Sequence, residues 1–419
     1  MITPIFSPYW RETILFWFGR SDVTFADKDS CIDTLINFDS NCGKFYYYRA
    51  CFLAAAAIAE FPESKYSQII INRLLEWRFA RFISDGNLWE YYPAPIQEGA
   101  RLALRQTDRV AAIAGLEKFL RSVNNPFLRW QAAHSLGKVF DPGNALAIEV
   151  LTDSLAAVDR SDLAIKICES LVKIDPQPNQ IAIDTLANIG QSSDRESIRR
   201  KAAFTLGKLL VEIELTDEYR SLLSLVINVL VETIASSPER ANRIAALDNL
   251  RQIAPTHPAA QQQLPDDRTP PSSMRSRRKK VGRERNISIA IAELEQKLAN
   301  VDNPESQRRY AYQLGRFQPG HPLAVNVLLQ LMSSPQAGSF YKRTGEYLRE
   351  IVLDEQLTLI ITQLKDSDRA VECGERSNST LECYKLLWDC AERLPYRVFD
   401  RIWVQSPGWA VCTHLQIED

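Results

Sequence analysis

The sequence RWQAAHSLGKVFDPGN, residues 129–144, returns in degraded form along the chain, and this repetition limits the possible folds more than any other feature. Every copy contains a leucine at the same place. The leucines of the six copies are Leu136, Leu171, Leu206, Leu250, Leu314 and Leu348. Their separations of 35, 35, 44, 64 and 34 residues indicate a repeat of about 35 residues with insertions in the two longer steps.

Each copy carries the apolar pattern of a helix that is buried on one side. In the first copy, Leu128, Ala132, Leu136 and Val139 recur at a spacing of three to four residues. Small residues such as Ala132 and Ala133 let neighbouring helices approach closely. We assign ten positions to this structural signature, namely Ala132, Leu136, Gly137, Leu171, Leu206, Gly207, Leu250, Leu314, Gly315 and Leu348.

The ends of these helices are also marked. Asn125-Pro126 and Asn303-Pro304 place a capping side chain before a proline, and residues 193–196 (SDRE) have the spacing of a capping box. Four first helices are expected to stop at a proline turn, at DPG (141–143), DP (175–176), AP (254–255) and QPG (318–320). A second apolar helix follows each turn.

A helix, a turn and a second helix repeated in this way predict an all-α fold, an α-solenoid in which each hairpin buries its apolar face against its neighbours. We expect an N-terminal helical cap with divergent repeats over residues 1–95, repeats over 96–264, and further repeats with a C-terminal helical cap over 286–405. Residues 265–285 are expected to be a disordered basic insert, and residues 406–419 a tail.

The sequences RWQAAHSLGKVFDPGN and RRYAYQLGRFQPGHPLA (residues 308–324) resemble HEAT repeats, in particular those that follow the nucleotidase module of bacterial NACHT-type signal-transduction proteins. PIFSPYWRETILFWFGR (4–20) looks like the segment that joins that module to its repeats, and CYKLLWDCAERLPYRVF (383–399) like the helical segment after them. The resemblance implies that the HEAT-like hairpins sense a partner or ligand for a NACHT-type ATPase in signalling or defence. The ATPase activity itself is not implied, because no GxxxxGK[ST] phosphate loop occurs.

Composition argues against several other classes of protein. The net charge of -2 predicts no global attraction to nucleic acid or anionic lipid. The eight cysteines form no CxxC pair and the four histidines are scattered, so we expect no metal site and no cofactor. The first twenty residues do not resemble a secretory signal, which suggests a cytoplasmic location. The longest apolar run, residues 222–235, falls short of the roughly 20 residues of a membrane span and predicts a buried helix and no membrane partner.

Residues 268–285 are the compositional exception, because they hold eight basic residues and one acid. Such a stretch cannot bury enough apolar surface to order its backbone. A solvated insertion is the preferred interpretation, and a tether for nucleic acid or an acidic protein is the alternative. The possible interaction residues are Arg275, Arg277, Arg278, Lys279, Lys280, Arg283 and Arg285.

Basic residues also recur at matching points of the repeats, before the alanines and after the leucine. Those after the leucine are Lys138, Lys173, Lys208 and Arg316. They could form a ladder that grips an acidic partner, although cations more often satisfy helix ends and pair with turn acids such as Asp141 or Asp175. The latter interpretation is preferred.

No catalytic motif is recognisable, and no residue is assigned a catalytic role. His134 is interpreted as a surface or packed side chain, and Cys383 and Cys390, two helical turns apart, as core residues. Trp89, Tyr91 and Tyr92 are candidates either for an interface anchor or for a contact between repeats.

We therefore expect a non-enzymatic scaffold that recognises protein partners. One alternative is a lyase subunit or chaperone, because similar HEAT-like repeats occur in the bacterial lyases that attach bilins to phycobiliproteins. A further alternative is nucleic-acid binding through the basic insert.

Overall fold

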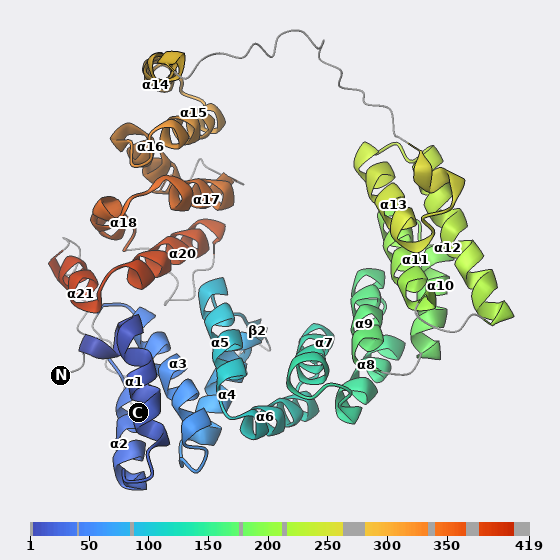
Figure 1. Ribbon diagram of the computed structural model, residues 1–419, viewed down its shortest axis with the longest axis horizontal. Coiled ribbons are helices and arrows are strands. Elements are labelled where there is room, and N and C mark those ends of the chain that lie inside the picture. The colour runs from blue at the N-terminus through green and yellow to red at the C-terminus, as the bar shows by residue number, and fades with distance from the viewer. Residues whose placement is uncertain are drawn as a thin grey trace. The chain divides into compact units, whose positions relative to one another are not determined.

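The computed structural model describes residues 3–39, 42–83, 88–175, 179–211, 216–262, 281–333, 340–365 and 377–405. Its elements are almost all helices, arranged as consecutive hairpins (Figure 1), so the predicted all-α helical-repeat solenoid is confirmed. The chain divides into two units. Unit 1 combines residues 1–108 with 274–419, and unit 2 consists of residues 109–273.

Unit 2 is a run of helices in which each packs against the next along the chain (Figure 1). First and second helices alternate from α7 onwards. The elements are α6 (Arg109–Ser122), α7 (Pro126–Ser135) with its π-helical continuation η3 (Leu136–Phe140), α8 (Ala145–Ala157), α9 (Ser161–Ile174), α10 (Gln180–Ser192), α11 (Glu196–Val211), α12 (Asp217–Ser236), α13 (Arg240–Ile253) and the 3-10 helix η4 (Pro258–Gln261).

Unit 1 is built from the two ends of the chain. Its N-terminal elements are η1 (Thr3–Phe6), α1 (Pro8–Gly19), α2 (Phe25–Ile36), α3 (Phe45–Glu60), α4 (Ser67–Arg78), the antiparallel strands β1 (Arg81–Ile83) and β2 (Leu88–Glu90), and α5 (Ala94–Gln106). Its C-terminal elements are α14 (Val281–Ala299), α15 (Pro304–Phe317), α16 (Pro322–Ser333), α17 (Tyr341–Ile351), η6 (Asp354–Gln356), α18 (Leu357–Leu364), α20 (Asn378–Arg393) and α21 (Tyr396–Gln405).

The two caps and the ends of the four first helices lie close to where the sequence predicts them. Asn125 Oδ1 accepts hydrogen bonds from two first-turn amides of α7 at 3.0 and 3.1 Å, and Asn303 Oδ1 accepts two in α15 at 2.9 and 3.3 Å. The four first helices end one residue before their predicted stops, at Phe140, Ile174, Ile253 and Phe317. Gly143 and Gly320, with φ of 81° and 76°, supply the left-handed conformation of two turns.

The signature residues form the contact between successive hairpins. All ten are buried, and the six leucines are exposed by 1% or less. A Cβ atom added to Gly137, Gly207 or Gly315 would lie 2.5, 2.4 or 2.5 Å from an isoleucine carbon of the following first helix. Those isoleucines, each three residues after the next repeat leucine, are Ile174, Ile253 and Ile351. Glycine is therefore needed because a neighbouring side chain occupies the space of its missing Cβ.

Two local predictions differ from the structure. The amides of the first turn of α11 bond to the carbonyl of Arg195, so Glu196 is the first helical residue and not the third residue that a capping box requires. Ser193 instead donates its amide to Ile189 at the end of α10, because that helix continues up to it.

The apolar run 222–235 lies in α12, which is longer than predicted because polar residues extend it to 20 residues. The length and composition of α12 would allow it to cross a membrane, but core helices of soluble proteins share these two properties. Its buried residues are Val226, Leu230, Thr233 and Ile234. This side packs on α11 and α13, whereas the other apolar side chains are partly exposed, so the helix is buried on one side only.

The grouping into units differs from the boundaries drawn from the sequence. Residue 95 is the second residue of α5, and residue 285 lies inside α14, which begins at Val281. The last five residues of the expected insert are therefore helical. The tail, residues 406–419, lies outside the described residues.

Candidate binding cavity beside the C-terminal helices

Helix α20 ends beside a proline that leaves one of its carbonyl groups without a helical partner. The carbonyl of Ala391 would accept from the amide of residue 395, but Pro395 has no N–H. Arg49 of α3 replaces it: Nη1 donates to the Ala391 oxygen at 2.7 Å, and Nη2 donates to the Phe6 oxygen at 3.2 Å. The Tyr46 hydroxyl also donates to Ala391, at 3.3 Å. A guanidinium at the negative end of the helix dipole is favourable, so this contact fixes α20 on α3.

Aromatic side chains complete the contact between the two ends of the chain. Phe45 of α3 is fully buried and its ring lies among four rings of α20 and α21. The ring centroids of Tyr384, Trp388, Phe399 and Trp403 lie 5.1, 6.1, 5.8 and 5.7 Å from that of Phe45. Such offset and edge-on arrangements add to the apolar burial. The position of α20 is therefore set by contacts about 340 residues away in sequence.

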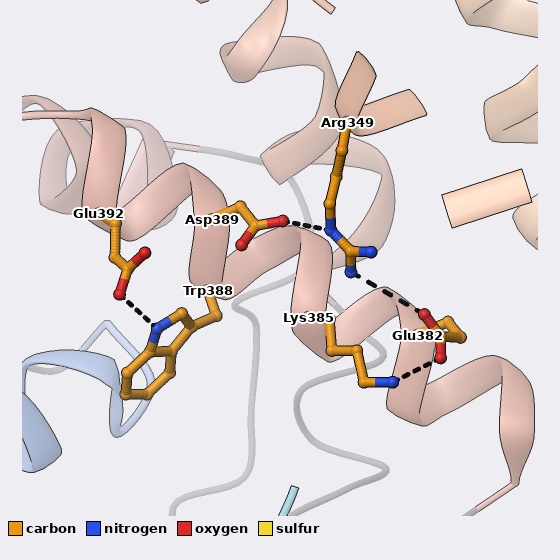
Figure 2. A network of polar contacts seen from close by, with 6 residues as sticks. All are labelled: Arg349, Glu382, Lys385, Trp388, Asp389 and Glu392. Atoms are coloured by element: carbon orange, nitrogen blue, oxygen red, sulfur yellow. Dashed lines mark hydrogen bonds and ion pairs between the residues drawn. The ribbon is translucent and has the colours of Figure 1, made fainter. Parts of the chain in front are cut away.

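One side of α20 carries a network of charged side chains with α17 (Figure 2). Arg349 of α17 donates through Nε to Asp389 and lies 3.8 Å from Glu382. Glu382, which is buried, also accepts from Lys385 at 2.5 Å. Buried charges need such partners, and here each cation has a carboxylate beside it. The network fixes the directions of Lys385 and Asp389.

The next turn of α20 adds an aromatic and an acidic side chain. Trp388 donates its indole N–H to Glu392 at 2.8 Å (Figure 2). Burial raises the pKa of Asp389 above its ordinary value, even though Arg349 acts to lower it. This face of α20 therefore offers charged groups of both signs around a tryptophan.

A cavity of about 680 Å³ lies between this face and the N-terminal helices of unit 1. Its volume is in the range typical of ligand-binding sites. The wall from α20 consists of Lys385, Trp388, Asp389 and Glu392, and the N-terminal wall includes Arg11, Arg49, Phe52, Leu53, Glu98, Gly99 and Leu102. A Cβ at Gly99 would lie 2.3 Å from a ring carbon of Phe52, so glycine allows α5 to approach α3 here.

A second cavity, of about 520 Å³, adjoins the first and shares Ala94 and Lys385 with it. Its lining includes Trp89, Tyr91 and Tyr92, the aromatic residues singled out from the sequence. The Tyr92 hydroxyl donates to Glu76 at 2.5 Å. These residues lie in and after the β1–β2 hairpin, which was not expected from the sequence. Their role as an interface anchor stays a prediction.

Residues 377–404, which form α20 and most of α21, match the family model described as NACHT C-terminal Cysteine and Histidine-containing. This segment links the chain to NACHT-associated proteins. It contains Cys383 and Cys390 and no histidine. No curated protein matches the chain. The resemblance of the repeats to HEAT repeats stays a prediction, because the matched segment follows them.

The residues predicted for interaction are not part of this cavity. Arg275, Arg277, Arg278, Lys279 and Lys280 lie outside the described residues. The backbone of α14 includes Arg283 and Arg285, whose side chains also lie outside that description.

The residues that build the cavity were not identified from the sequence. Arg49 was visible as the arginine of YYYRACFL, a possible divergent repeat, but its contact with α20 is not local. The available signal was Pro395, which shows that Ala391 must find a distant donor. Arg349 and Asp389, in turn, look like ordinary surface charges until α17 and α20 are placed side by side.

Replacing Asp389 by asparagine is expected to weaken the pH dependence of unit 1 stability. Because its folded pKa is raised, the folded chain holds this proton more tightly than the unfolded chain does. The resulting stability is complete below the unfolded value of 3.8 and is lost as the pH rises through the folded pKa. Urea unfolding of the wild type and of Asp389→Asn at a series of pH values measures the free energy of unfolding of each. The same dependence of this free energy on pH in both proteins would contradict the prediction.

Cys168 and Cys390 are expected to resist alkylation in the folded protein. Burial, as the main cause, raises the pKa of each thiol to about 12, so little thiolate exists at pH 8. Reaction with iodoacetamide, followed by peptide mass spectrometry, should be roughly 100-fold slower or more than in urea. The half-buried Cys31 should react before them in the folded protein, and equal rates for all three would refute the expectation.

Proposed function

We propose that the chain is a non-enzymatic recognition module in NACHT-associated signalling, and that it holds a ligand or partner segment in the cavity beside α20. The observation that carries this proposal is that the NACHT-associated segment supplies one wall of a cavity whose other wall comes from the N-terminal helices. A site assembled from both ends of the chain requires the folded unit and not the matched segment alone.

The lining favours an occupant that is both polar and apolar. Asp389 and Glu392 provide acceptors, Lys385 and Arg349 provide donors, and Trp388 provides an aromatic surface. A peptide segment offers main-chain donors and acceptors together with apolar side chains, and it suits this combination.

The experiment fills the mouth of the cavity. Leu102 of α5 lines the cavity and is 45% exposed, so Leu102→Trp adds a ring there without changing the core. Leu323→Trp is the matched control, because Leu323 of α16 is 37% exposed and does not line the cavity. The wild type and both variants would be cross-linked in cells that naturally produce the chain, and the partners identified by mass spectrometry.

A NACHT-type signalling protein should be cross-linked to the wild type and to Leu323→Trp, and lost from Leu102→Trp. An unchanged set of partners in all three proteins would overturn the proposed site. Co-expression with a bilin and a phycobiliprotein provides a second test, because a covalent bilin adduct would contradict the non-enzymatic role.

A further inference from the structure

Charge is separated between the first and the second helices of unit 2. The first helices, α7 with η3, α9, α11 and α13, contain eleven lysines and arginines and four acids. The second helices that follow three of them, α8, α10 and α12, contain one arginine and six acids. The separation appears only in the fold, because residues 109–262 as a whole hold seventeen basic and eighteen acidic residues.

Five exposed lysines of the first helices occupy equivalent positions. Three lie two residues after a repeat leucine, and two lie five residues before one. The first three are Lys138, Lys173 and Lys208, and the other two are Lys166 and Lys201. We call these five residues the lysine face. Positions seven residues apart lie on the same side of a helix, about 10 Å apart. Neighbouring first helices pack against one another at a similar distance of about 8–10 Å, so the lysine face is a regular grid.

Several arginines of unit 2 are paired with acids. Arg160, Arg220 and Arg251 each form an ion pair with a nearby aspartate. Within the described ranges, none of the five lysines forms an ion pair with an acid. One acid, Glu169, lies among them and accepts from the Thr205 hydroxyl at 3.3 Å.

The lysines of the face affect a nearby histidine, and two of them lie over aromatic rings. The pKa of His134 is lowered, mainly by burial and further by the charges of Lys138 and Lys173. Lys166 Nζ lies 5.2 Å from the ring centre of Trp130, and Lys208 Nζ lies 4.6 Å from that of Phe204. The rings hold these two ammonium groups at the surface without neutralising them. Like charges held together in this way favour an anionic partner.

We infer that the lysine face is the docking surface for an acidic protein segment, in particular for a helix with carboxylates about two turns apart. The spacing of the lysines along each first helix matches such a pattern of carboxylates. A nucleic-acid duplex fits less well, because its charges recur every 1.7 Å or so and need a longer positive surface. The second helices, which pack against the first helices, are acidic and would repel a polyanion that extends onto them.

The test uses fluorescein-labelled poly-L-glutamate as the probe and the full chain at low salt. The face variant carries Lys138→Gln, Lys173→Gln and Lys208→Gln. The control variant loses the same net charge at three exposed lysines outside the face, through Lys118→Gln, Lys297→Gln and Lys342→Gln. Fluorescence anisotropy measures the dissociation constant of each protein, with duplex DNA and single-stranded RNA as competitors.

The face variant should bind poly-glutamate at least tenfold more weakly than the wild type, and the control within twofold of it. An equal loss in both variants, or a loss in neither, would overturn the inference, as would stronger binding of DNA or RNA through the same lysines. Leu102→Trp should bind poly-glutamate like the wild type, since the lysine face belongs to unit 2. The proposed function of the cavity and the proposed role of the lysine face can therefore be refuted independently of each other.

Discussion

Replacing Gly207 by alanine is expected to destabilise unit 2 by about 1–3 kcal/mol, although the same change stabilises most helices. The added Cβ would lie 2.4 Å from Ile253 Cδ1 and 2.9 Å from Val226 Cγ1. Both neighbours are buried and belong to different helices, so either these side chains must shift within a packed core or α11 must move away from α12 and α13. Hydrogen exchange followed by mass spectrometry, read on peptides of α11 and α13, measures the loss.

Gly190 provides the matched control in the preceding helix of the same unit. A Cβ added there would meet only the Ala203 amide nitrogen at 3.9 Å, an ordinary contact. Gly190→Ala is therefore expected to stabilise unit 2 by up to about 1 kcal/mol, through the lower conformational freedom of the unfolded chain. Effects of the same sign for the two variants would refute the packing that we describe between the hairpins.

Replacing Phe45 by alanine is expected to cost unit 1 about 3–5 kcal/mol. The side chain is fully buried among four aromatic rings of α20 and α21, and its loss leaves a cavity that rigid rings cannot fill. Hydrogen exchange should accelerate in α3 and in α20 together, even though they lie at opposite ends of the sequence.

Phe16 serves as the control for this change, because it lies in the same unit and is 74% exposed. Phe16→Ala should alter the free energy of unfolding by no more than about 0.5 kcal/mol. If Phe45→Ala accelerated exchange in α3 but not in α20, the two ends of the chain would not share a core.

The local features of the fold were predictable because their causes are local. Asn125, Asn303 and the proline turns act within a few residues, and the repeat leucines follow from helical periodicity. The prediction of a capping box at residues 193–196 was wrong. Because α10 extends to Ser192, Ser193 is the C-cap of α10 and not the N-cap of α11, which begins at Glu196. Side-chain spacing alone does not show where the preceding helix ends.

The candidate cavity could not be predicted because it depends on distant contacts. Arg49 and Ala391 are 342 residues apart, and no repeat pattern relates them. The lysine face is an intermediate case. Its residues follow the repeat, but only the structure shows that Lys138 and Lys173 both lie close to His134 and that, in the part of the chain that the structure describes, neither forms an ion pair with an acid.

The division of unit 1 between the two ends of the chain determines when each part can fold during synthesis. Unit 2 is continuous and holds its own core, so it can fold once residue 262 has left the ribosome. The aromatic surface of α3 must wait for α20 and α21, which are translated more than 300 residues later. Until then, Phe45 and its neighbours remain exposed, and nascent chains of this protein are expected to depend on chaperones over that interval.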